Sequence, residues 1–196
     1  MPLRRHLCVF LGSSNRAAPM YFDAARAVGV ALADAGQALV YGGAKVGLMG
    51  ALADAALGAG AEARGVIPRQ LADKEVAHDG LTELFVVDSM HERKVKMYEL
   101  ADAFLALPGG FGTFEELFEI ATWGQLGLHR KPIGVLDVGG YYSSLRAFLD
   151  GAVDAGLLAS EHRALLLFDD DPARLVATLE THEPPTFDKL IGREGT

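Results

Sequence analysis

The 196-residue sequence contains a single cysteine, Cys8, and aromatic residues make up only 8% of it. One cysteine excludes an internal disulfide and a metal cluster built on several cysteine ligands. The six histidines are scattered without the spacing of metal ligands, so we assign no metal and expect no cofactor. Cys8 lies within an apolar run, and we interpret it as a core residue.

The sequence also lacks a hydrophobic run long enough to cross a membrane. Its longest uncharged stretch, residues 103–114, is interrupted by one proline and three glycines, whereas a membrane helix needs about 20 apolar residues. The basic first residues precede a short apolar run at 7–11. That run leads into Gly12-Ser13-Ser14-Asn15, which is typical of a loop and not of a signal-peptide cleavage site. We therefore expect a soluble, cytoplasmic protein with no membrane partner.

Basic residues are scarce relative to acidic ones. The chain has 18 Lys and Arg against 26 Asp and Glu, which gives a formal net charge of −8. This charge argues against nucleic acid as a partner, although it leaves room for a local basic pocket. Half of the residues are hydrophobic, which excludes intrinsic disorder, and the length predicts one domain.

Short apolar runs alternate with longer segments of helical periodicity. We predict strands at 7–11, 38–41, 63–67, 84–87, 103–107 and 133–136, helices at 17–35, 48–59, 90–100, 114–126 and 142–155, and a final strand and helix at 165–168 and 172–181. The strands are apolar on both faces, as in sheets covered by helices on each side. The pattern predicts an α/β fold with a doubly wound parallel sheet. We expect one domain over residues 1–183 and a flexible tail over 184–196.

Ligands of open parallel sheets bind at the carboxyl ends of the strands. The strongest candidate loop there is LPGGFGTFEE, residues 107–116, with three glycines in four positions. Glycine lets a ligand approach the backbone closely, and the following helix offers free amide N–H groups to a phosphate. The alternative is a tight turn with Thr113 as helix N-cap and Glu116 three residues later. The two interpretations are compatible.

Two carboxylates, Glu115 and Glu116, follow this loop. They favour the positive end of the helix dipole, but they would repel a phosphate at close range. An arrangement that satisfies both has the amides holding phosphate while one carboxylate faces an adjoining sugar. There it would stabilise an oxocarbenium ion or act as nucleophile or base, as carboxylates do in glycoside hydrolysis.

A second candidate loop spans residues 88–97, DSMHERKVKM. Ser89 and Glu92 predict a capping box, which puts Arg93 and Lys94 near a helix start, where cations oppose the dipole. A solvated basic face is the alternative. Residues 89–97 carry three bases and one acid, a local charge of +2 in a protein of −8. We therefore interpret Arg93 and Lys94 as an anion site.

Two further loops are weaker candidates. The segment YGGAKVGLMG, residues 41–50, is similar to a dinucleotide fingerprint but lacks the G-x-G-x-x-G spacing. Gly12-Ser13-Ser14 offers amides and hydroxyls after the first predicted strand. Each of them fits a simple turn equally well. Four such loops at one sheet edge predict a site the size of a mononucleotide.

These motifs resemble the LONELY GUY (LOG) family of cytokinin riboside 5′-monophosphate phosphoribohydrolases, long labelled lysine decarboxylases. PGGFGTFEE at 108–116 fits the family signature P-G-G-x-G-T-x-x-E, and MHERK at 90–94 matches its companion motif M-H-x-R-K. The resemblance covers about residues 7–168. No lysine lies in a recognisable pyridoxal phosphate context, so the sequence does not favour a decarboxylase.

The resemblance implies a Rossmann-like homodimer that cleaves the N-glycosidic bond of a nucleoside 5′-monophosphate. The products would be ribose 5-phosphate and a free base, such as an N6-modified adenine. Arg93 and Glu116 are implied as the catalytic pair. With the loops above, the resemblance predicts substrate contacts at Ser13, Gly42, Gly43, Glu75, Met90, Arg93, Lys94, Gly109, Gly110, Phe111, Gly112, Thr113, Phe114, Glu115 and Thr122.

Two other classes of function compete with this one. A non-catalytic nucleotide or cofactor carrier of the same fold would not need Arg93 and Glu116 together. A nicotinamide-dependent oxidoreductase is disfavoured by the incomplete fingerprint and by the absence of a ribose-binding acid after the second predicted strand. The sequence leaves open which base is preferred. It also leaves open whether Glu116 acts as nucleophile, base or electrostatic stabiliser.

Overall fold

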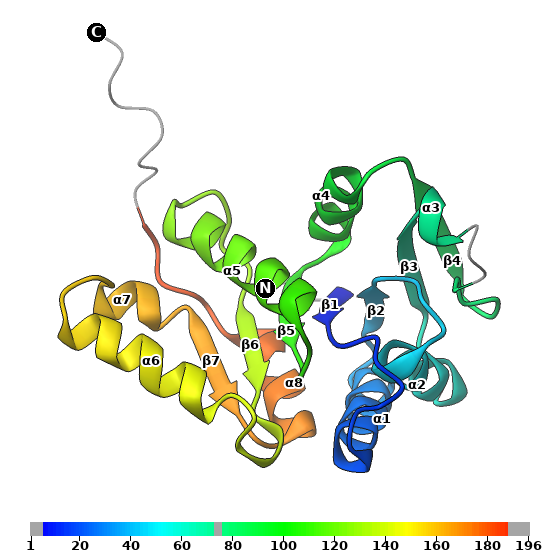
Figure 1. Ribbon diagram of the computed structural model, residues 1–196, viewed down its shortest axis with the longest axis horizontal. Helices are drawn as coiled ribbons and strands as arrows, with labels where there is room; N and C mark the ends of the chain where they lie inside the picture. Colours follow the sequence, from blue (N-terminus) through cyan, green and yellow to red (C-terminus); the bar gives the residue numbers. More distant parts are fainter. Residues whose placement is uncertain (1–5, 73–75, 188–196) are drawn as a thin grey trace, which may run out of the picture.

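Seven parallel strands form one sheet in the order β4-β3-β2-β1-β5-β6-β7 (Figure 1). The computed structural model describes residues 6–72 and 76–187. Its strands are β1 His6–Phe10, β2 Ala38–Tyr41, β3 Ala63–Pro68, β4 Glu83–Val87, β5 Ala103–Ala106, β6 Ile133–Leu136 and β7 Leu166–Asp169. The order reverses between β1 and β5, which creates the switch point where doubly wound sheets bind ligands. The predicted Rossmann-like sheet is confirmed.

Helices connect the strands and cover both faces of the sheet. The long helices are α1 Pro19–Asp34, α2 Gly47–Gly58, α4 Met90–Leu100, α5 Phe111–Gln125, α6 Ser143–Asp154 and α8 Pro172–Thr181. Three short ones were not predicted: α3 Arg69–Ala72, η1 Val138–Gly140 and α7 Ser160–Arg163. Segments of three or four residues contain too little periodicity to be recognised from sequence.

Two hydrophobic clusters fill the spaces between the sheet and its helices. In β1, Leu7 and Val9 point into the cluster formed with α1, α2 and α8. Cys8 and Phe10 point into the opposite cluster, formed with α4, α5 and α6. This alternation follows from the two-residue period of a strand. Cys8 is fully buried, so its interpretation as a core residue is confirmed.

Two details differ from the sequence expectations. β4 is an edge strand whose Val86 is 42% exposed, so not every strand is covered on both faces. α5 begins at Phe111 with Gly110 as its N-cap, so the predicted cap at Thr113 is wrong. The extended backbone of Gly110 starts the helix three residues early and leaves Thr113 buried inside its first turn.

Several expectations fall partly or wholly outside the described part of the chain. Residues 188–196 of the predicted tail lie there, as does Glu75.

None of the helices in the described ranges has the length and apolar character that a membrane span requires. The predicted cap of α4 is confirmed, because the Ser89 hydroxyl accepts a hydrogen bond from the Glu92 amide at 3.1 Å.

Candidate active site

A cavity of about 460 Å³ opens at the carboxyl edge of the sheet. The loops after β1, β2, β3 and β5 form its walls together with α4 and the first turns of α2 and α5. Eight of the predicted site residues line it: Ser13, Gly42, Arg93, Gly110, Phe111, Gly112, Thr113 and Glu116. The topology therefore brings together segments about 100 residues apart in sequence, on both sides of the switch point.

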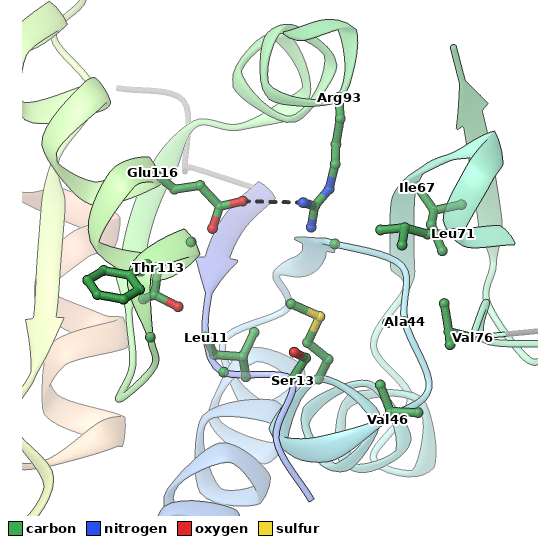
Figure 2. Close-up of a pocket in the computed structure, with 16 residues that line it drawn as sticks. Leu11, Ser13, Ala44, Val46, Ile67, Leu71, Val76, Arg93, Thr113 and Glu116 are labelled. Atoms are coloured by element: carbon green, nitrogen blue, oxygen red, sulfur yellow. Dashed lines mark ion pairs between the residues drawn. The ribbon is translucent and has the colours of Figure 1, made fainter. Parts of the chain in front are cut away.

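Arg93 and Glu116 face each other across this cavity (Figure 2). Arg93 Nη1 lies 3.7 Å from Glu116 Oε1, and the two residues are only 7% and 8% exposed. The Nε of Arg93 donates a hydrogen bond of 3.1 Å to the carbonyl oxygen of Val66. This bond fixes one edge of the guanidinium and leaves its other nitrogens directed at Glu116 and the cavity.

Gly42 provides the room that the guanidinium occupies. A Cβ atom at this position would overlap Nη2 of Arg93 and would also press on the side chain of Met49. Gly42 lines the cavity, and glycine is needed there because any larger residue would displace Arg93. Gly43 has a φ of +75°, a backbone conformation that favours glycine, and it is not part of the cavity wall.

Burial raises the pKa of Glu116 to about 7, and the nearby charge of Glu115 also raises it. The positive charge of Arg93 acts in the opposite direction and favours the ionised carboxylate. Such a group exchanges protons near neutral pH, which suits a catalytic carboxylate. Glu116 thus combines a raised pKa with a place in the cavity wall.

The loop between β5 and α5 presents unpaired hydrogen-bond donors. Its four consecutive carbonyl oxygens are all occupied, by the Tyr142 hydroxyl at Leu107 (2.7 Å), the Gly12 amide at Pro108 (3.2 Å), the Tyr141 hydroxyl at Gly109 (2.5 Å) and the Phe114 amide at Gly110 (3.1 Å). Within the described residues, the amides of 109–113 have no acceptor. Unpaired amides at the positive end of a helix bind phosphate well. We call the amides of 109–113 the anion seat.

The wall opposite the α5 helix start is apolar. Ile67, Leu71 and Val76 line it, with Ala44 and Val46 beside them (Figure 2). Backbone hydrogen bonds tie this wall together, because the Lys45 amide donates to the Val76 carbonyl at 2.8 Å. The cavity therefore joins an anion seat, a buried charged pair and an apolar surface. Such a combination fits an amphipathic ligand.

Several predicted contact residues lie elsewhere. Lys94 is held between Glu115 and Glu119 at 2.5 and 2.9 Å, so it links α4 to α5 instead of lining the cavity. The hydrogen bond to Glu115 also raises the pKa of Lys94. Thr122 donates to the carbonyl of Phe118 at 2.7 Å on an exposed face of α5. The other four, Met90, Gly109, Phe114 and Glu115, do not line the cavity either.

Sequence reasoning missed two tyrosines and the apolar wall. Tyr141 and Tyr142 follow β6 and bond to the β5–α5 loop, 32 and 35 residues away in sequence. Their position just after a predicted strand, at the carboxyl edge of the sheet, was the available signal. Leu71 and Val76 flank a short segment without recognisable periodicity, so nothing in the sequence pointed to them.

Fold and site together define a class of protein: a Rossmann-like α/β enzyme with a carboxylate–arginine pair beside an anion seat. The chain matches the family model described as "Possible lysine decarboxylase" over residues 49–179. It is 44% identical to the cytokinin riboside 5′-monophosphate phosphoribohydrolase LOG7 of Arabidopsis thaliana, covering 96% of this chain and 87% of that protein. The chain belongs to this phosphoribohydrolase family.

Other relatives agree with this assignment. The probable cytokinin riboside 5′-monophosphate phosphoribohydrolase LOGL9 of Oryza sativa subsp. japonica is 47% identical, over 92% of this chain and 79% of its own. Among solved structures, the molybdenum cofactor binding protein of Rippkaea orientalis matches with a TM-score of 0.69 and 19% identity, over 90% of this chain and 96% of that one. The Moco carrier protein of Chlamydomonas reinhardtii gives 0.67 and 22%, over 89% and 94%. The solved structures show a shared fold alone.

Proposed function

We propose that this protein hydrolyses the N-glycosidic bond of an N6-modified adenosine 5′-monophosphate, releasing the free base and ribose 5-phosphate. The observation that carries the proposal is the Arg93–Glu116 pair, which faces the cavity beside the unpaired amides of 109–113. The names of the relatives, which describe cytokinin riboside 5′-monophosphates as substrates, support the same reaction.

In the proposed mechanism, the loop amides hold the 5′-phosphate and the ribose extends toward Glu116. The bond between C1′ and the base breaks, and its electron pair leaves with the base. Positive charge develops on the ribose, and the ionised Glu116 stabilises it at close range. Water then adds to C1′, and Glu116 accepts its proton, which is finally passed to the departing base. A pKa of about 7 leaves a large fraction of Glu116 ionised at neutral pH.

Arg93 contributes in two ways to the proposed reaction. Its charge opposes the effect of burial on Glu116 and so keeps more of the carboxylate ionised. Its guanidinium nitrogens not bonded to Val66 are free to donate to ribose hydroxyls or phosphate oxygens. A carrier would bind the nucleotide without needing a buried carboxylate opposite this arginine.

The apolar wall supports the choice of an N6-modified base. With the ribose beside the Arg93–Glu116 pair, the remaining part of the cavity is bounded by Ile67, Leu71 and Val76. A purine with an apolar N6 substituent buries more surface there than adenine does, and each buried methylene contributes about 0.8 kcal/mol. The proposal therefore places N6-substituted monophosphates above AMP as substrates.

Replacement of Glu116 by Gln tests the proposal. The variant keeps the size of the side chain but cannot stabilise a cation or take a proton, so we expect base release to fall at least about 1000-fold. Incubation with AMP and N6-isopentenyl-AMP, followed by assay of free base and ribose 5-phosphate, gives the rate. Calorimetric titration with AMP should show binding within a few-fold of the wild type.

The outcomes separate the candidate functions. Wild-type turnover in the Gln variant would remove Glu116 from the chemistry and leave it a buried structural residue. Tight nucleotide binding by the unmodified protein without release of base would instead favour a carrier. Faster hydrolysis of AMP than of N6-isopentenyl-AMP would contradict the role of the apolar wall while leaving the hydrolase intact.

A further inference from the structure

The hydroxyl of Tyr141 is bonded to the loop that presents the unpaired amides. It donates to the carbonyl oxygen of Gly109 at 2.5 Å, although Tyr141 belongs to the segment after β6. The neighbouring Tyr142 donates to Leu107 at 2.7 Å, one residue beyond the end of β5. The segment after β6 therefore binds the β5–α5 loop at two points.

The two bonds have different consequences for the amides. A peptide unit is planar and trans, so fixing a carbonyl oxygen also fixes the direction of the N–H on the same unit. The carbonyl of Gly109 shares its peptide with the N–H of Gly110, one of the unpaired donors. The carbonyl of Leu107 shares its peptide with Pro108, which has no N–H. Of the two tyrosine bonds, only the one from Tyr141 sets the direction of a donor.

This peptide needs an external constraint because glycine lies on both sides of it. Glycine has more accessible backbone conformations than any other residue, so the peptide between Gly109 and Gly110 is intrinsically easy to rotate. A Cβ at Gly110 would meet no atom within 4 Å, so neighbouring groups do not hold this residue by packing. Gly109 packs closely against Thr113 and Gly12, and the hydroxyl of Tyr141 supplies a hydrogen bond at the peptide itself.

The ring of Tyr141 is only partly buried and lies at the surface of a second cavity. It is 38% exposed and lines a second cavity of about 360 Å³, together with Tyr21, on the side of the loop near α1. The rings of Tyr21 and Tyr141 meet edge to face with centroids 5.6 Å apart, and Tyr142 lies 4.9 Å from Tyr141. These two contacts orient the ring so that its hydroxyl reaches Gly109.

We propose that Tyr141 is a positioning residue that orients the Gly110 amide toward the phosphate of the substrate. The proposal rests on the proposed function in one respect, since it takes the bound anion to be a sugar 5′-phosphate. Tyr141 acts through the loop and does not touch the reacting atoms. Its effect therefore lies on phosphate affinity and not on the bond-breaking step.

Replacement of Tyr141 by Phe tests this role by removing only the hydroxyl. We expect the Kd of the variant for ribose 5-phosphate to rise about five- to tenfold, the effect of misdirecting one hydrogen bond. The kcat at saturating N6-isopentenyl-AMP should stay within about twofold of the wild type, while KM rises with Kd. Tyr21→Phe is the matched control, because the Tyr21 hydroxyl makes no hydrogen bond to any described residue.

The results distinguish the possibilities. An unchanged Kd in the Tyr141 variant, or an equal rise in the Tyr21 variant, would overturn the role of the hydroxyl. A wild-type protein that binds ribose 5-phosphate yet releases no base would refute the proposed function, and the Kd comparison would still decide the role of Tyr141. A wild type that binds neither ribose 5-phosphate nor AMP would overturn the anion seat and Tyr141's role with it.

Discussion

The two glycine-rich loops beside the cavity look alike in sequence but use glycine for opposite reasons. After β2, a Cβ at Gly42, Gly47 or Gly50 would overlap the guanidinium of Arg93 or the backbone of Ser13 or Lys45. After β5, a Cβ at Gly110 or Gly112 would meet nothing within 4 Å. The β2 loop needs glycine so that the protein can pack against itself. At Gly110 and Gly112 the β5 loop keeps open space beside unpaired amides, where a ligand can approach, whereas a Cβ at Gly109 would overlap Thr113 and the backbone of Gly12.

The two loops also position the two members of the charged pair, Arg93 and Glu116. Gly42 makes room for Arg93, which arrives from α4. The β5 loop begins α5 at Phe111, so that Glu116 lies in the second turn with its side chain buried at the cavity. Substitutions in the β2 loop should therefore damage the site even without ligand. Substitutions at Gly110 and Gly112 should weaken ligand binding without distorting the empty site.

Among substitutions in the two glycine-rich loops, the largest expected effect is that of Gly42→Ala. The added methyl overlaps Arg93, so the guanidinium must move away from Glu116. A displacement of about 1 Å in a catalytic group costs on the order of 100-fold in rate, and we expect kcat/KM to fall by at least that factor. Steady-state assays of base release measure it. Gly58→Ala at the end of α2, where a Cβ meets no atom within 4 Å, is the control. Wild-type activity of Gly42→Ala would refute the packing role.

The free energy of unfolding should depend on pH through the buried carboxyl of Glu116. The folded state raises the pKa of this carboxyl from 4.5 to about 7, so between these pH values the folded protein binds a proton that the unfolded chain has released. Stability therefore falls as pH rises from about 4.5 to 7 and is constant above, with a total cost of roughly 3 kcal/mol. The Gln variant should lack this loss.

Thermal unfolding of Glu116→Gln and wild type at pH 5 and pH 8 measures the effect. The variant should gain stability relative to the wild type between the two pH values, because Gln resembles the protonated carboxyl at both. Glu119→Gln is a useful control, because Glu119 lies on α5 like Glu116 but pairs with Lys94 of α4. If the difference in stability between variant and wild type were the same at pH 5 and pH 8, the folded state would not raise the pKa of Glu116.

Most of the sheet was predictable because buried parallel strands are continuous apolar runs. The strands at 38–41 and 133–136 have the predicted bounds. The start of α5 was not predictable in the same way. Thr113 and Glu116 match a capping box, but the backbone of Gly110 decides where the helix begins. A local pattern cannot show which of two adjacent starts the surrounding loop imposes.

The site was predictable where one motif carries the chemistry and unpredictable where distant segments meet. Arg93 and Glu116 lie in recognisable motifs, and the fold brings them to 3.7 Å. Lys94 shares a motif with Arg93, yet its partners Glu115 and Glu119 on α5 take it out of the cavity. Tyr141 has only its place after a predicted strand as a signal, because its role depends on a carbonyl 32 residues away.

The smallest expected effect, and the sharpest test of the open loop, is that of Gly112→Ala. This residue lies in the first turn of α5, where an added Cβ meets nothing within 4 Å. Alanine in a helix is favoured over glycine by up to about 1 kcal/mol, so the variant should be slightly more stable. The methyl narrows the cavity beside the unpaired amides, and ribose 5-phosphate should bind about fivefold more weakly.

Gly151→Ala on α6 separates the two effects of that substitution. Its added Cβ also meets nothing within 4 Å, and it lies in a helix that takes no part in the cavity wall. It should gain a similar fraction of a kcal/mol in chemical denaturation and leave the Kd for ribose 5-phosphate unchanged. If Gly112→Ala also left that Kd unchanged, the phosphate would not lie against this turn. The open space at Gly110 and Gly112 would then not be where the phosphate binds.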